Sequence, residues 1–192
     1  MPPRNQAALD FLLQRRSRPA KLFTLPVPDR AALEEILTAA LRVPDHGKLE
    51  PWRLVILQGA AFARLAELAE ARALELGGDA EKVAKGRGQY DAGKLAVVVI
   101  ASPKPAPKVP EVEQLLSAGA LCIGIVNAAE AAGWGACWLT GWPAHDMDFA
   151  AHAFGCTAGE SVAGIVHIGT PPADAPDRPR PDLGRQITWI DA

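Results

Sequence analysis

The side chains of this sequence best suited to binding a ligand are arginines. Arg15 and Arg16 stand next to Ser17, and Arg42 lies four residues before His46. Guanidinium groups bind phosphates and carboxylates through paired hydrogen bonds, and a serine hydroxyl can add another. The same arginine pair also suits the C-terminal end of a helix, where cations are favourable. From these residues alone, that structural explanation is the simpler one.

The common motifs for catalysis by side chains are missing. The segments around Gly86 and Gly133 lack the third glycine of a dinucleotide-binding turn, and Gly124 is followed by Ile and Val instead of the Lys and Ser or Thr of a phosphate-binding loop. Ser161 lacks the last glycine of a nucleophile elbow. The four histidines show no ligand spacing with one another. We therefore expect no metal site and no catalytic side chain.

The composition is that of one globular domain. The chain has 192 residues, of which 49% are apolar and 22% charged, so we expect residues 1–192 to share a single core. A net charge of −2 without a dense basic patch argues against nucleic-acid and acidic-membrane partners. Three widely spaced cysteines argue against a disulfide framework. The sequence shows no signal-type segment and no uninterrupted apolar run of about 20 residues, so it predicts a cytoplasmic protein.

Periodicity and helix-ending residues predict an α+β fold. Asp29 is a helix N-cap, and Pro44 forbids continuation of the helix that follows it. Four prolines between 103 and 110 predict an exposed loop, and the polar stretch 86–93 is expected to be mobile. The expected helices are residues 5–16, 29–42, 60–76, 111–132 and 147–154, and the expected strands are residues 52–58, 95–101, 136–140, 162–168 and 187–190.

Two segments need neighbours beyond the predicted core. Helix 111–132 carries apolar side chains around most of its circumference, which is typical of a helix covered on several faces. Segment 172–192 begins too rich in proline to build a core, yet it ends in a strand-like stretch, Ile187-Thr188-Trp189-Ile190, that needs a partner sheet. Such an extended tail can cross to a second subunit.

Four short motifs, taken in order, resemble one family. RRSR at 15–18 follows the first helix, and LRVPDH at 41–46 precedes PWRLV at 51–55. GWGACWLTG at 133–141 follows the long helix, and GTP at 169–171 precedes the tail. Each motif is weak alone, but their common order and spacing are specific and run nearly from end to end. The sequence resembles the FMN-dependent nitroreductases, most closely the compact bacterial branch of NAD(P)H nitroreductases.

The resemblance implies a three-layer α/β/α fold with a mixed, mainly antiparallel central sheet. It also implies a homodimer that holds FMN at the subunit interface and exchanges a C-terminal strand within the tail, 172–192. The implied reaction transfers hydride from NAD(P)H to the flavin N5, and electrons then pass to a small-molecule acceptor, such as a nitroaromatic or quinone, in ping-pong order. This division agrees with the scarcity of reactive side chains.

The resemblance also assigns cofactor-binding residues in the first half of the chain. Arg15, Arg16 and Ser17 would reach the phosphate, the ribityl chain and the pyrimidine edge. Arg42 and His46 would contact the cofactor from a helix end enforced by proline, although a lone loop histidine is usually only solvated. Either Arg16 or Arg42 would stabilise the anionic reduced flavin.

In the second half, the matching segment is Trp138, Leu139 and Thr140, whose main chain would pass along the flavin ring. A helix cap followed by an ordinary buried strand would look the same without the match. A tail arginine would close on the phosphate, and Arg180 is preferred to Arg178, although a solvated basic tail has the same composition.

One departure and two rival functions stay open. The segment at 48–50 reads Lys-Leu-Glu where many family members have an Asn before Gln-Pro-Trp, which leaves a polar contact there in doubt. The same scaffold could carry different flavin chemistry, such as flavin fragmentation or reductive dehalogenation. The protein could also be a flavin-binding dimer without catalytic activity.

Overall fold

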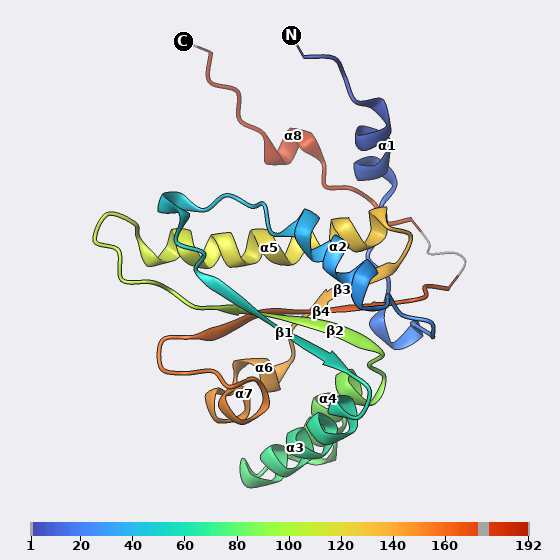
Figure 1. Cartoon of the computed structure of the whole chain (residues 1–192), viewed down its shortest axis with the longest axis vertical. Coiled ribbons are helices and arrows are strands. Elements are labelled where there is room, and N and C mark those ends of the chain that lie inside the picture. Colours follow the sequence, from blue (N-terminus) through green and yellow to red (C-terminus); the bar gives the residue numbers. More distant parts are fainter. Residues whose placement is uncertain (1, 173–176, 192) are drawn as a thin grey trace.

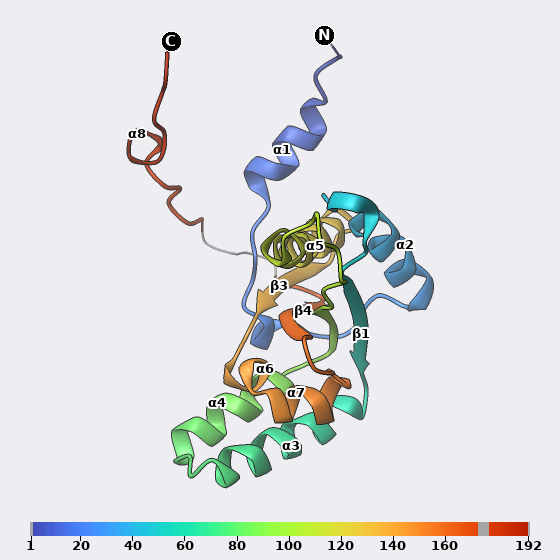
Figure 2. The same ribbon diagram turned by 90° about the vertical axis from the view of Figure 1, so that its left-hand side faces the viewer.

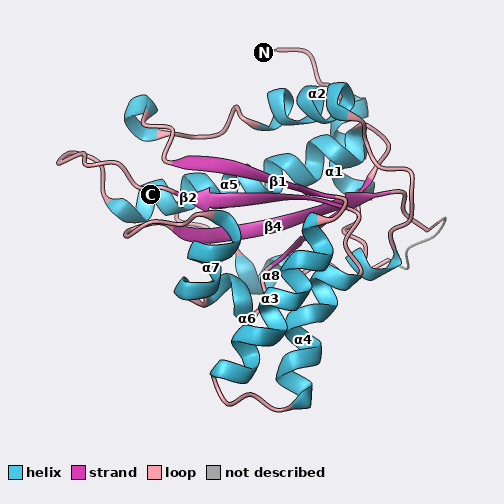
Figure 3. Ribbon diagram, turned by 60° about the horizontal axis from the view of Figure 1, so that its bottom comes forward, coloured by secondary structure: helices cyan, strands magenta, loops and turns pink. Residues whose placement is uncertain are grey.

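The computed structural model describes residues 2–172 and 177–191 and has three layers (Figures 1 and 3). Its central sheet has the strand order β1-β2-β4-β3, and all three pairings are antiparallel. The strands are β1 (Trp52–Gln58), β2 (Leu95–Ala101), β3 (Gly135–Leu139) and β4 (Ser161–Gly169). The three-layer α+β fold expected from the sequence is confirmed.

Helices cover both faces of the sheet. One face carries α2 (Arg30–Ala40) and α5 (Glu111–Ala131), and the other carries α3 (Ala61–Glu75), α4 (Ala80–Asp91), α6 (Trp142–His145) and α7 (Met147–Phe154) (Figure 1). Two further helices, α1 (Gln6–Gln14) and α8 (Leu183–Gln186), extend with the two chain ends beyond α5 (Figure 2).

The central strand β2 shows why the sheet needs both helical layers. Every residue of LAVVVIA is buried, because helices cover both faces of this strand. Ala96, Val98 and Ile100 belong to the core shared with α3 and α7, whereas Val97 and Val99 belong to the core shared with α2 and α5. The sheet therefore divides the apolar interior into two cores.

The polar stretch 86–93, expected to be mobile, lies mostly within the helix α4. Asp79 caps this helix through a hydrogen bond from the Lys82 main-chain N–H. Two glycines weaken the helix, but packing outweighs their low propensity: Tyr90 is fully buried, and a Cβ at Gly86 would lie 2.7 Å from the ring of Trp142. The short helix α6 was also not expected.

Among the described residues of the single chain, helix α5 is covered on one face only. Its buried side chains pack against the sheet and α2, but Val112, Leu115, Leu116 and Ile123 are exposed at helical spacing. By length and composition α5 could cross a membrane, yet in this fold it belongs to the core between α2 and the sheet. Its uncovered apolar stripe is the kind of surface that binds a partner.

Residues 177–191, the part of the tail beyond 172 that the structure describes, form no strand that pairs with the sheet. Residues 187–190 are extended, and Trp189 and Ile190 are 80% and 91% exposed. Exchange of this segment with a second subunit therefore stays a prediction. Residues 173–176, within the proline-rich segment expected from the sequence, lie outside the described residues.

Candidate functional site

The site expected along β3 lies at an open edge of the sheet. In the strand order of the described residues, β3 has β4 on one side only. The Ala136 carbonyl points away from β4, because it accepts hydrogen bonds from the Arg18 main-chain N–H at 3.3 Å and the Ser17 hydroxyl at 3.4 Å. Main-chain groups alternate along a strand, so those of Trp138 point to the same open side. They are therefore placed to bind a ligand.

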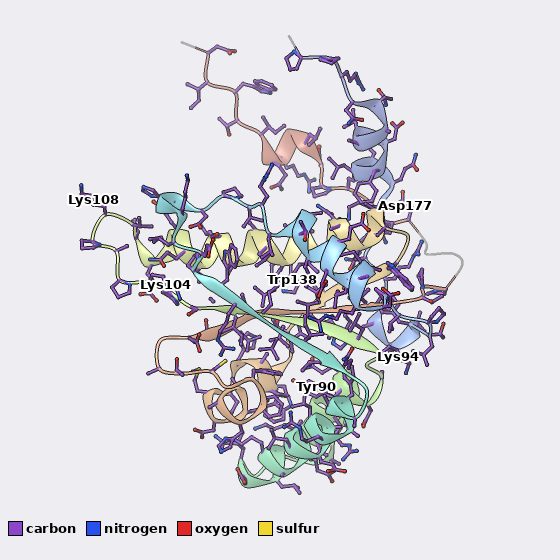
Figure 4. All side chains as sticks on the ribbon, in the orientation of Figure 1. Tyr90, Lys94, Lys104, Lys108, Trp138 and Asp177 are labelled. Atoms are coloured by element: carbon purple, nitrogen blue, oxygen red, sulfur yellow. The ribbon has the colours of Figure 1, made fainter. Side chains whose placement is uncertain are left out.

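The arginine segment after α1 lies beside this edge. The Arg15 Nε donates to Glu130 on α5 at 3.2 Å, and the Arg16 Nε lies 4.0 Å from the Asp177 carboxylate on the tail. Figure 4 places Asp177 on the side of the molecule where α1 ends. Along an ideal strand, residue 138 lies about 7 Å from residue 136, and residue 140 about 14 Å. Arg15, Arg16 and Ser17 thus stand at one end of the open edge, and Thr140 at the other.

The Trp138 side chain packs against two glycines. Its indole lies on the α5 face of the sheet (Figure 4), beside Gly119 of α5 and directly over Gly164 of β4. A Cβ at Gly164 would lie 2.0 Å from the indole Nε1, so no other residue fits there without moving the ring. The packed indole fixes the course of the chain through Leu139, which is half-buried, into Thr140, which is exposed.

The second group of expected residues, Arg42 and His46, comes from a different segment of the chain. His46 Nδ1 lies 2.7 Å from Glu113 Oε2, near the start of α5, whereas Arg15 pairs with Glu130 near its end. These two glutamates are 17 positions apart, or about 25 Å along a helix. A single chain therefore does not bring Arg15 and His46 together.

Two cavities lie at this second group. Arg42 lines one of about 500 Å³ with Trp52 and Asp45, and His46 lines another of about 380 Å³ with Glu113 and Leu116. The segment between them is held by Asp45, whose carboxylate accepts from the main-chain N–H groups of residues 49 and 50 at 3.1 and 2.8 Å. Leu116 belongs to the exposed stripe of α5, so the cavity opens on that stripe.

Arg180 lies with the first group. Its Nη2 donates to the Leu13 carbonyl at the end of α1, where a helix leaves carbonyls unpaired. The Arg178 main-chain N–H donates to the Asp177 carboxylate. Arg180 therefore contacts the end of α1, just before the arginine segment.

Two residues beside the first group were missed. Glu130 is nearly buried, and Arg18 lines the same cavity as Arg15 and Arg16. The sequence contained a signal for Arg18, since it belongs to the same basic motif. It contained none for Glu130, which is 115 positions away from Arg15.

Few titratable groups of the core are placed where they could act as catalytic acids, bases or nucleophiles. Burial lowers the pKa of His167 to about 4 and raises the pKa of the Cys122 thiol to about 12, so both stay neutral near pH 7. Hydrogen bonds from Arg53 lower the pKa of Glu160 to about 2 in an ion pair between β1 and the residue that precedes β4. Residues 2–172 and 177–191 contain no group of three or more metal-ligating side chains.

Comparison with known proteins gives a consistent result. A family model described as "Nitroreductase family" matches residues 12–170. The "Putative NAD(P)H nitroreductase YdjA" of Escherichia coli K12 is 32% identical over 164 residues, which cover 85% of this chain and 88% of that protein. A nitroreductase-like family protein from Bacillus cereus superimposes with a TM-score of 0.81 at 21% identity, with full coverage of both chains. A variant of NfnB from Sphingopyxis sp. strain HMH, described as an FMN and NADPH-dependent nitroreductase, has a TM-score of 0.74 at 20% identity and covers 95% of this chain and 98% of its own.

Proposed function

The chain belongs to the nitroreductase family, and on that premise we propose that it is a homodimeric, FMN-dependent oxidoreductase. It would take hydride from NAD(P)H and reduce small acceptors such as nitroaromatics and quinones in ping-pong order. The names of its relatives support the reductant and the reaction class, and the FMN dependence of NfnB supports the cofactor. Three buried free cysteines fit the expected cytoplasmic location.

The residues at the open edge of β3 fit FMN. A flavin mononucleotide carries a dianionic phosphate, a polar chain and a flat ring, so it needs cations at one end and main-chain groups with a flat surface at the other. Arg15, Arg16 and Arg180 supply the cations, Ser17 a hydroxyl, and the strand from Trp138 onward the main chain. The close packing of the indole on Gly164 keeps that main chain in one position.

A second chain would complete the site. The exposed stripe of α5 is an apolar surface that needs a partner, and a second copy has the same surface. A twofold axis perpendicular to α5 would pair the helix antiparallel to its copy and place the Glu113 end of one chain beside the Glu130 end of the other. Arg42 and His46 of one protomer would then face Arg15 and Arg16 of its partner. This arrangement would explain why Arg15 and His46 lie beside opposite ends of α5 within one chain.

The protein's own contribution would be binding and electrostatics. Bound FMN would supply the hydride acceptor at N5, which the side chains of this chain cannot supply. Arg16 or Arg42 would stabilise negative charge near the pyrimidine edge. The Trp138 to Thr140 main chain would hold the ring, and the partner's helix would exclude water from one side. No acid, base or nucleophile is required of the protein.

The observation that carries this proposal is the open edge of β3 beside three arginines. The test is an absorption spectrum of the purified protein, followed by anaerobic addition of NADH or NADPH. We expect a flavin spectrum that bleaches on addition and returns when a quinone is added. The double variant Arg15→Ala with Arg16→Ala should purify as a folded, colourless dimer.

Three outcomes would contradict parts of the proposal. A wild-type protein that cannot be loaded with flavin would exclude the FMN assignment. Bound flavin that neither NADH nor NADPH reduces would leave a flavin-binding dimer without this activity. Release of a benzimidazole from reduced flavin under oxygen would instead identify flavin fragmentation.

A further inference from the structure

A cavity of about 380 Å³ near the start of α5 brings together two side chains that can hold and transfer a proton. Pro44, Leu116 and Ala120 form its apolar walls, and His46 and Glu113 belong to its polar lining. Ligand pockets are typically apolar with a few polar groups that fix orientation, and their volumes run from about 300 to 1,000 Å³. At the lower end of that range, this cavity suits a compound of one or two aromatic rings.

The imidazole of His46 is oriented by Glu113. Its Nδ1 lies 2.7 Å from Glu113 Oε2, and an ionised carboxylate can only accept, so Nδ1 carries the proton between them. Glu113 stands in the first turn of α5, where a negative charge interacts favourably with the helix dipole. In the described part of the chain, Nε2 of this ring has no hydrogen-bond partner, and the side chain is 57% exposed. Nε2 is therefore the accessible ring nitrogen for a ligand in the cavity.

Few other charged groups face this ring. Asp45 accepts from the main-chain N–H groups of residues 49 and 50, and Lys48 lines the neighbouring cavity. The loop 102–110 lies against Gly47 and carries Lys108 at its outer tip (Figure 4). Of the carboxylates that the structure describes, Glu113 alone is within ion-pair distance of the imidazole. In the proposed homodimer, the arginine segment of the partner would also face it.

Reduction of a quinone consumes a proton as well as a hydride. One quinone, one hydride and one proton give one hydroquinone, and the proton goes to the oxygen that becomes negative when the hydride arrives. Water can supply this proton, but an acid held in place supplies it faster. A His46 imidazolium that donates from Nε2 would become a neutral imidazole, keep its Nδ1–H on Glu113 and regain a proton from water.

We propose that His46 is a catalytic proton donor to an acceptor bound in this cavity, and that Glu113 is the positioning residue that holds its ring. The inference rests on the proposed function, which supplies the hydride. The family resemblance assigns His46 to the cofactor and gives Glu113 no role. The acceptor class that fits is a small aromatic compound whose oxygen takes up a proton on reduction, such as a quinone.

The first test compares two acceptors that differ in their need for a proton. Holoenzyme reduced with dithionite is mixed in a stopped-flow instrument with menadione, or with ferricyanide, which takes up electrons only. In His46→Gln, the menadione rate relative to the ferricyanide rate should fall about 100-fold or more, the size of a general-acid contribution. Weaker cofactor binding alone would lower both rates together. His152→Gln, at an exposed position on α7, should leave the ratio unchanged.

The second test reads the proton position directly. Nitrogen NMR of labelled histidine side chains distinguishes the two neutral tautomers, and His46→Gln assigns the signal. We expect the Nδ1–H form in the wild type, because the hydrogen bond at one ring nitrogen sets the tautomer. Glu113→Ala should lose this preference and lower the menadione-to-ferricyanide ratio. Glu113→Gln keeps an acceptor oxygen and should retain more of both.

Three results would overturn the inference. An unchanged ratio in His46→Gln would exclude the proton-donor role. An Nε2–H tautomer of His46 in the wild type, or a tautomer unchanged in Glu113→Ala, would exclude the positioning role of Glu113. A wild type that binds no flavin would refute the proposed function itself, and the inference with it.

Discussion

Replacing Leu116 by Ala should weaken self-association of this protein without weakening its fold. Leu116 is 67% exposed in the single chain, on the stripe of α5 that also carries Val112, Leu115 and Ile123. It contributes little to the core of its own protomer, so its truncation should cost little folding stability. In the proposed homodimer it lies in the contact between the two α5 helices.

The size of the effect follows from the exposed area. Burying a fully exposed leucine contributes about 1.5–3 kcal/mol, so two-thirds of that is about 1–2 kcal/mol per side chain. Twofold symmetry removes the side chain from both protomers and doubles the loss to about 2–4 kcal/mol. At about 1.4 kcal/mol per factor of ten, the dimer Kd should rise about 30- to 700-fold.

Sedimentation velocity over a range of protein concentrations measures this Kd, and a flavin spectrum of each sample measures cofactor retention. Leu74→Ala is the matched control, because Leu74 is 60% exposed on α3, on the opposite side of the sheet. We expect the control to associate like the wild type and Leu116→Ala to lose dimer and flavin in parallel.

Three results would refute this reasoning. A monomeric wild type would remove the proposed interface, and an unchanged Kd in Leu116→Ala would place the interface elsewhere. Flavin retained in full by a monomeric Leu116→Ala protein would show that one chain binds FMN alone. The last result would contradict the composite site even if the stripe on α5 is the dimer contact.

Three further predictions concern stability. The pKa of His167 is about 4 in the folded protein, below its ordinary value of 6.5. The unfolded chain therefore binds the proton first as pH falls, so folding stability is lost between pH 6.5 and about pH 4 and does not fall further below that. His167→Leu should remove about 2–3 kcal/mol of the difference in urea-unfolding free energy between pH 7 and about 4.5; an unchanged pH profile would refute this. The ion pair of Glu160 with the arginine of β1 stabilises above pH 4.5 and is lost as pH falls toward 2, so Glu160→Gln should cost about 1–3 kcal/mol at pH 7 and nothing near pH 2. Gly164→Ala should displace the Trp138 indole, lower the free energy of unfolding by about 1–3 kcal/mol and shift the tryptophan fluorescence to the red. Gly88→Ala is the control, because a Cβ at Gly88 has no atom within 4 Å, and it should cause none of these changes.

The sequence determined the elements of this fold because their signals are local. The bounds of β1, β2 and α7 match the expected 52–58, 95–101 and 147–154. Apolar runs bounded by Gly, Pro or Asp carry that information within a few residues. The helix at 86–93 was not expected for the opposite reason, since two glycines disfavour a helix locally and packing against distant residues such as Trp142 helps to stabilise it.

The sequence also supplied the residue types of the candidate site, since the ordered motifs marked Arg15, Arg42 and Trp138 as ligand-binding positions. Only the tertiary structure placed Arg15 beside Glu130, near the end of α5, and His46 beside Glu113, near its start. It also showed the pairing of Arg15 with Glu130 and the buried, unpaired Nε of Arg18. These properties depend on which side chains meet across more than a hundred residues, and no spacing along one strand or helix encodes that. Sequence motifs identify the groups that can bind a phosphate, but only the packing of the folded chain determines which of their charges are not already paired.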